Sequence, residues 1–130
     1  MADLPVSTVS VQYMVDDVKA AIYFYTGYLG FRVESDSSPA FAAVTRGNLR
    51  LLLSGEQSSG RRPMPDGTRP TPGGWNRIEL PVQNIEQEAQ RLRAAGVKFR
   101  RDDIVTGPGG SQVWLLDPSG NIVELFEAKN

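Results

Sequence analysis

The sequence contains no cysteine and no histidine. Without cysteine there can be no disulfide framework and no thiol chemistry. Histidine is the commonest transition-metal ligand in proteins and the commonest general base near neutral pH. Any metal site or reaction mechanism assigned to this chain must therefore work without either residue type.

The chain also lacks a strong charge imbalance and a long apolar run. Its formal net charge is -1, which gives no sign of binding to nucleic acid or to an anionic membrane. No stretch approaches the roughly 18 apolar residues of a membrane span, and Met1–Pro5 has neither the basic start nor the apolar run of a signal peptide. Its 130 residues, 40% of them hydrophobic, fit one compact domain with its own core. We expect a soluble cytoplasmic protein that contacts no nucleic acid and no membrane.

The first half of the chain changes from a strand pattern to a helix pattern and back. Apolar and polar residues alternate over Val9–Val15, which predicts a strand. Asp17 follows at a helix N-cap position, and apolar residues then recur at helical spacing as far as Gly30. Further strands are expected at 31–35, 41–45 and 49–53.

The second half shows the same succession of patterns. Residues Trp75–Val82 alternate, and Asn84 occupies the cap position of a helix that ends at Gly96. A strand is expected to begin at Val97–Arg100. The last two strands, at 113–116 and 122–126, enclose a turn at Asp117–Gly120.

The two halves also repeat one another in sequence. Val15–Val18 matches Val82–Ile85 at an offset of 67, and Gly47–Leu51 matches Gly120–Glu124 at an offset of 73. The order therefore predicts an α+β fold in which two βαβββ modules form a cupped mixed sheet with the helices outside. We expect a single domain over 1–130, composed of module 1 (6–55), a Pro/Gly-rich linker (56–73) and module 2 (74–128).

The connection between the halves is unusually long and rich in proline. Residues 54–74 contain four prolines and three arginines. Such a segment is either a mobile linker or a lid over a pocket, with its arginines meeting an anion.

Two segments resemble the vicinal oxygen chelate superfamily, which includes glyoxalase I, extradiol dioxygenases and bleomycin-resistance proteins. They are Val15–Phe31, which looks like the superfamily's first helix signature, and Asp117–Leu125, which looks like its closing hairpin. The resemblance covers nearly the whole chain. It implies a small-molecule pocket and a homodimer, but no particular activity, because the fold hosts many.

The resemblance also marks four positions where metal-using members place their ligands: Ser10, Leu51, Arg77 and Glu124. Only Glu124 is a residue type that the family uses. Serine is a poor ligand, leucine cannot bind a metal, and arginine brings a fixed positive charge. We therefore predict no metal and no cofactor.

Arg77 is the most informative of these residues. Its guanidinium is expected to pair with Glu124, either as a positive centre that binds an anionic ligand or as a structural salt bridge closing a vestigial site. Glu124 is in turn either a weak candidate for a general base or only the partner of Arg77, whose charge favours the ionised carboxylate.

Other residues are expected to accompany these four. Gln12 and Glu79 lie two residues beyond Ser10 and Arg77, as further polar contacts or as solvated side chains at a sheet edge. The aromatic side chains of Phe41 and Trp114, matched by the repeat, are either pocket walls or core. The predicted ligand-binding set is Ser10, Gln12, Phe41, Leu51, Arg77, Glu79, Trp114 and Glu124.

Three functions are compatible with these patterns. The first is a metal-free protein that binds or sequesters a small organic ligand, with an anion as one option. The alternative is an enzyme of the same superfamily, of lyase, isomerase or dioxygenase type, that uses a divalent metal or the pair of Arg77 and Glu124. A third is a domain that has lost both metal and ligand and serves in a larger assembly.

Overall fold

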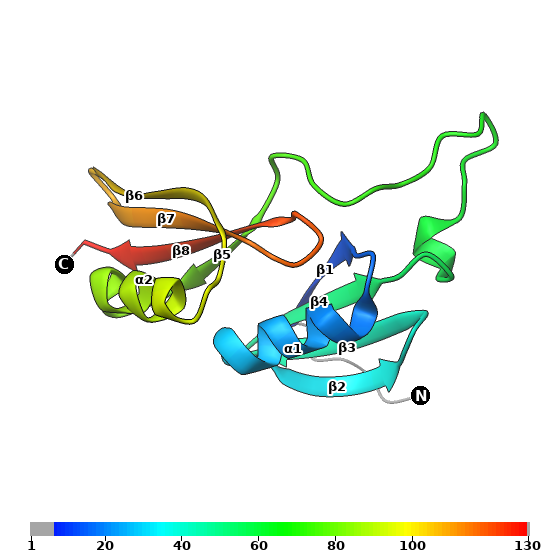
Figure 1. Cartoon of the computed structure of the whole chain (residues 1–130), viewed down its shortest axis with the longest axis horizontal. Helices are drawn as coiled ribbons and strands as arrows, with labels where there is room; N and C mark the ends of the chain where they lie inside the picture. Colours follow the sequence, from blue (N-terminus) through cyan, green and yellow to red (C-terminus); the bar gives the residue numbers. More distant parts are fainter. Residues whose placement is uncertain (1–6, 130) are drawn as a thin grey trace. The chain divides into compact units, whose positions relative to one another are not determined.

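The computed structural model describes residues 7–129, which form two compact units with their boundary between Pro72 and Gly73. Each unit consists of one sheet and one helix that covers a face of that sheet (Figure 1). Within 7–129, none of the helices has the length and apolar character needed to cross a membrane.

The first unit contains a four-stranded sheet in the order β1-β4-β3-β2. Strand β1 runs parallel to β4, and the other neighbours are antiparallel. Its elements are β1 (Val9–Met14), α1 (Val18–Tyr28), β2 (Arg32–Ser37), β3 (Phe41–Arg46) and β4 (Leu49–Ser54), followed by the short 3-10 helix η1 (Ser59–Arg61).

The second unit repeats this topology with the order β5-β8-β7-β6. Strand β5 is again parallel to the last strand of the unit. Its elements are β5 (Ile78–Pro81), α2 (Ile85–Ala94), β6 (Phe99–Gly107), β7 (Gly110–Leu116) and β8 (Ile122–Ala128). The predicted α+β class and the βαβββ order of both modules are confirmed.

Both helices begin at the predicted N-cap residues. The Asp17 carboxylate accepts a hydrogen bond from the backbone N–H of Ala20 at 3.0 Å, and the Asn84 side chain accepts one from Gln87 at 3.1 Å. These bonds satisfy N–H groups that have no partner within the helix. In the second unit, Glu127 of β8 also accepts from the backbone N–H of Ile85 at 2.8 Å, which ties the helix to the sheet.

Alternation along the strands divides each sheet into an apolar face and a mixed face. In the second unit, Ile78, Leu80, Val113, Leu115, Val123 and Leu125 are buried on the face that α2 covers with its buried side chains Ile85, Ala89 and Leu92. Residues at the intervening positions, including Glu79, Trp114 and Glu124, therefore point to the opposite face. The first unit follows the same rule, with Val44, Leu51 and Leu53 buried beneath α1.

Among the strand boundaries that differ from the sequence-based expectation, two lie close to the residues discussed below. Pairing with β8 begins at Ile78, so Trp75 precedes the strand that was predicted to include it. Gly73 and Gly74 have φ values of +102° and +99°, which take the chain out of the extended conformation just before Trp75. The strand β6 extends to Gly107. Its pairing with β7 is irregular around Arg101, so its sequence does not show the regular alternation of apolar and polar residues.

The long connection is anchored through one of its arginines. The Arg61 guanidinium donates to the backbone carbonyls of Val15 at 2.8 Å and Pro70 at 3.1 Å, and its side chain is only 9% exposed. Its hydrogen bonds therefore hold the segment to the first unit. Arg61 does not fit the alternative in which the arginines of a lid meet an anion.

The cap of α2 offers a test of this architecture. Replacing Asn84 by alanine removes the acceptor for the Gln87 N–H, so we expect the free energy of unfolding to fall by about 1 kcal/mol in urea titrations. Gln83→Ala, one residue earlier, alters an exposed side chain and is expected to leave stability within about 0.5 kcal/mol of the wild type. Equal stability of the two variants would contradict the capping role.

Candidate functional site

The second sheet brings four of the predicted residues together on the face opposite α2. Glu79 on β5 lies directly beside Glu124 on β8, and Glu124 lies beside Trp114 on β7. Arg77 is two residues before Glu79 and reaches the same group. Three neighbouring strands thus contribute side chains to one cluster.

The Arg77 guanidinium is the centre of this cluster. Its Nε lies 2.9 Å from Oε1 of Glu124, its Cζ lies 4.0 Å from the centroid of the Trp114 ring, and its Nη1 donates to the backbone carbonyl of Trp75 at 3.1 Å. The predicted ion pair is therefore present. The Arg77 side chain keeps 26% of its surface exposed, whereas the Glu124 side chain keeps only 6%. The cation is fixed in orientation and remains accessible to a ligand.

The Trp114 ring that stacks on this cation is itself held in place. Its Nε1 donates to the side-chain oxygen of Gln112 at 2.7 Å. A half-buried indole whose N–H is satisfied has little freedom to rotate. The guanidinium and the indole therefore form a preformed stack.

A hydrogen bond between carboxyl groups links Glu79 to the ion pair. A hydrogen bond with Glu124 is the main reason that the pKa of Glu79 is raised, and burial and the negative charge of Glu124 act in the same direction. The positive charge of Arg77 opposes the rise in pKa but is the weaker effect. The protonated form of Glu79 is therefore favoured more than in a free glutamate.

A buried turn positions the segment that leads to this cluster. The Asp117 carboxylate accepts hydrogen bonds from the backbone N–H groups of Ser119 and Asn121, both at 2.9 Å, and from the Asn121 side chain at 3.0 Å. The Asn121 side-chain oxygen accepts from the backbone N–H of Gly73 at 2.8 Å. The turn thereby anchors the chain two residues before Trp75.

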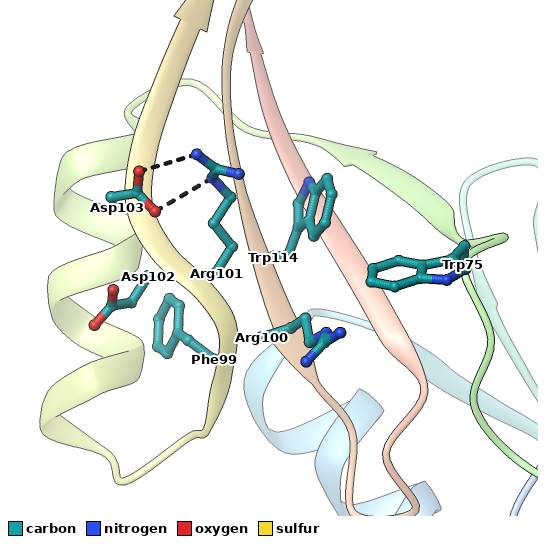
Figure 2. Close-up of a pocket in the computed structure, with 7 residues that line it drawn as sticks. All are labelled: Trp75, Phe99, Arg100, Arg101, Asp102, Asp103 and Trp114. Carbon is teal, nitrogen blue, oxygen red and sulfur yellow. Dashed lines mark hydrogen bonds and ion pairs between the residues drawn. The ribbon is translucent and has the colours of Figure 1, made fainter.

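Next to the cluster lies a groove that sequence analysis largely missed. It has a volume of about 480 Å³ and is lined by Trp75, Phe99, Arg100, Arg101, Asp102, Asp103 and Trp114 (Figure 2). The Arg100 guanidinium carbon lies 4.9 Å from the Trp75 ring centroid, and Arg101 pairs with Asp103 at 3.2 Å. Of these residues only Trp114 belonged to the predicted set. The charged run at 100–103, directly after an expected strand start, was the available signal.

The first unit places the other predicted residues on two different faces. Ser10 and Gln12 lie on the face away from α1, in register with Arg50 and Leu52, and the side-chain oxygen of Gln12 accepts a hydrogen bond from the Ser54 hydroxyl at 2.6 Å. Phe41 is half-buried and in register with Ser54.

Leu51 does not lie beside Ser10. It pairs with Val11 and Val44, is fully buried, and belongs to the apolar face beneath α1. The offset of 73 was therefore wrong by one residue, and the strand register makes Leu52 the counterpart of Glu124. The match of Phe41 with Trp114 is wrong by two residues, because Trp114 pairs with Glu124 whereas the residue that pairs with Leu52 is Ala43.

The residues at these positions do not fit a metal ion. Glu124 is the one carboxylate at an expected ligand position, and it is already bonded to a guanidinium. Leu52 is as unable to coordinate a cation as Leu51. Among residues 7–129, no group of three or more aspartate, glutamate, histidine or cysteine side chains is arranged to hold a metal.

Comparison with known proteins identifies relatives of the whole chain. Residues 8–125 match the family model described as "Glyoxalase/Bleomycin resistance protein/Dioxygenase superfamily". A superfamily member from Sphaerobacter thermophilus is 28% identical, with a TM-score of 0.71 over 92% of this chain and 95% of that one. No curated protein matches the sequence significantly.

Two further solved structures share the fold at lower identity. Lactoylglutathione lyase from Agrobacterium tumefaciens is 22% identical, with a TM-score of 0.74 over 95% of each chain. TnmS3, described as an antibiotic binding protein from a Streptomyces species, is 23% identical, with a TM-score of 0.71 over 99% of each chain. These likenesses concern the fold.

The raised pKa of Glu79 predicts a dependence of stability on pH. The native state retains the Glu79 proton at pH values where the unfolded chain has lost it. The stabilisation is complete below the ordinary glutamate pKa and disappears as the pH rises through the raised value. Glu79→Gln keeps a donor for Glu124 without titrating, so urea titrations between about pH 4 and 8 should show a flatter profile than the wild type. Glu56→Gln, on an exposed residue of the first unit, should retain the wild-type slope; an unchanged slope in Glu79→Gln would argue against the raised pKa of Glu79.

Proposed function

We propose that this chain, which belongs to the Glyoxalase/Bleomycin resistance protein/Dioxygenase superfamily, binds a small organic anion at Arg77 without using a metal ion. The single observation that carries the proposal is the Arg77 guanidinium, which is fixed by Glu124 and Trp114 at a position where metal-using relatives are expected to place a ligand. Arg77 thus supplies a permanent positive charge in place of the charge of a metal ion.

The chemistry of the guanidinium supports an anion as the bound group. Its Nε donates a hydrogen bond to Glu124 and its Nη1 donates one to the backbone carbonyl of Trp75. About a quarter of the side-chain surface remains exposed to solvent. The exposed N–H groups can donate charge-assisted hydrogen bonds to a carboxylate, phosphate or enolate oxygen. Because the guanidinium is already oriented, little conformational entropy is lost when the anion binds.

Sequestration of an organic molecule is favoured over turnover. The described residues offer no histidine, no cysteine and no metal-binding cluster for catalysis. The antibiotic-binding description of TnmS3 shows that a protein of this fold can bind a small organic molecule. The homodimer expected from the family stays a prediction.

One observation favours an enzyme as the second candidate. Glu79 has a raised pKa, and a carboxyl group that titrates closer to neutrality is better suited to general acid–base catalysis. In that case Arg77 would stabilise an oxyanion or enolate while the Glu79–Glu124 pair exchanged a proton with the substrate. Product formation from a ligand that depends on Arg77 would distinguish this function from simple binding.

Removing the cation should abolish binding. In a thermal-shift screen of small organic acids, we expect compounds that stabilise the wild type to lose at least about tenfold in affinity with Arg77→Ala, since a charge-assisted hydrogen bond contributes about 1.5–3 kcal/mol. Glu124→Gln should weaken binding less or even strengthen it, because the anion no longer competes with a carboxylate.

Loss of fold must be separated from loss of binding in this test. Arg77→Ala leaves the buried Glu124 carboxylate without its partner, which itself costs stability. The double variant Arg77→Gln/Glu124→Gln replaces the ion pair by two neutral amides. It should show the wild-type circular dichroism spectrum and still fail to bind the acids. Normal binding by this double variant would refute the proposal.

A metal-free site also predicts the outcome of metal analysis. Protein purified without chelators and then dialysed against zinc, nickel, manganese or iron(II) should retain less than stoichiometric metal by elemental mass spectrometry. The reason is the donor set, in which a guanidinium and an aliphatic side chain occupy expected ligand positions. Ligand thermal shifts should be equal with and without the metals, and one tightly bound ion per chain that Glu124→Gln removed would reverse this conclusion.

A further inference from the structure

We propose that the groove beside Arg77 binds a planar aromatic ring, and that Arg100 binds an anionic substituent of the same molecule. This inference rests on the proposed function and names the chemical class of its ligand: an aromatic carboxylate, or a related aromatic anion. It concerns Trp75, Phe99 and Arg100, which lie outside the cluster of Arg77, Glu79 and Glu124.

Two indoles line the groove. Trp75 comes from the segment before β5 and Trp114 from β7, and Figure 2 shows both indoles bordering the open region beside Arg100. Trp75 is 63% exposed, an unusual state for a side chain that is large and apolar. It is held there by the glycines and by the Asn121 hydrogen bond to Gly73. A flat ring stacked on Trp75 would cover this apolar surface.

The charge balance of the groove favours an anion. Figure 2 shows the Arg101 guanidinium joined to Asp103, and the Asp102 carboxylate directed away from Trp75 and Arg100. The Arg100 guanidinium lies against the face of the Trp75 ring. Arg100 is therefore a cation stacked on an indole, and an anionic group could pair with it while the stack persists.

The size of the groove limits the ligand. A volume of about 480 Å³ falls within the usual range for small-molecule sites, roughly 300–1,000 Å³. One or two fused rings with a short acidic substituent fit this volume. Of the two arginines that lie against indoles of the groove, Arg100 is the one that lines it, so the acidic substituent is assigned to Arg100.

Intrinsic tryptophan fluorescence can report binding at this site. Its only two tryptophans, Trp75 and Trp114, both line the groove. A ring that stacks on them should change the intrinsic tryptophan fluorescence, and Trp75→Leu should remove the part of the change that comes from Trp75. Because Trp75 is mostly exposed, this substitution does not threaten the core.

Three probes separate the contributions of the ring and the charge. They are 2-naphthoate, the uncharged 2-naphthalenemethanol and the non-aromatic cyclohexanecarboxylate, each titrated by calorimetry into the full-length protein. We expect 2-naphthoate to bind at least about tenfold more tightly than either of the others, which corresponds to about 1.4 kcal/mol. Equal affinity for cyclohexanecarboxylate would overturn the inference, because the ring would then contribute nothing.

Variants identify the groove as the place of binding. Arg100→Gln should weaken 2-naphthoate about tenfold and leave 2-naphthalenemethanol unchanged, whereas Trp75→Leu should weaken both. Arg91→Gln is the matched control, because Arg91 lies on α2 and pairs there with Glu88; it should bind all three probes like the wild type. Unchanged binding of 2-naphthoate by Arg100→Gln and Trp75→Leu would overturn the inference.

Failure of this inference can be told from failure of the proposed function. If small organic acids bind and depend on Arg77 but not on Trp75 or Arg100, the groove is not the ring site and the Arg77 site stands. If no acid from the screen or the probe set binds the wild type, both proposals fail. A 2-naphthoate affinity that depends on Arg77, Trp75 and Arg100 together supports both.

Discussion

The ion pair between Arg77 and Glu124 is the interaction on which the rest of the site depends. A buried carboxylate with 5% exposure needs a partner, and the guanidinium supplies both a charge and a hydrogen bond. The pair fixes the direction of Arg77, which lets it stack on Trp114, and it places Glu124 where its hydrogen bond raises the pKa of Glu79. Changing either partner therefore alters the charge state of the whole face.

The turn at Asp117–Asn121 connects the fold to this site. Its hydrogen bonds satisfy the side chains of the buried Asp117 and Asn121. The side-chain oxygen of Asn121 also accepts a hydrogen bond from the backbone N–H of Gly73. A sequence motif that identifies the family by its closing hairpin thus also sets the path of the segment carrying Trp75. In this chain the motif is structural, and its effect on binding is indirect.

The order of elements could be predicted from the sequence because it depends on local patterns and caps. Asp17 and Asn84 cap the helices as predicted, and the repeat gave the topology of both units. The pair of Arg77 and Glu124 was also predictable, because the family resemblance placed both residues at one site. The position of Leu51 was not, because an error of one residue turns a strand side chain to the opposite face. The groove depends on the non-extended glycines before Trp75 and on irregular pairing in β6, which no periodic pattern reveals.

An arginine at a position where metal-using relatives are expected to place a ligand changes what a sheet face of this kind can do. A metal ion binds ligand oxygens at short distances and lowers the pKa of a bound water molecule. A guanidinium binds oxygens through its N–H donors and does not lower the pKa of water to a comparable extent. A guanidinium also stacks on indoles, which a hydrated divalent cation does less readily because it keeps its waters. The two stacks of Arg77 on Trp114 and Arg100 on Trp75 follow from that property. The combination of a cation with ring surface is what supports the proposal that this face binds a flat anion.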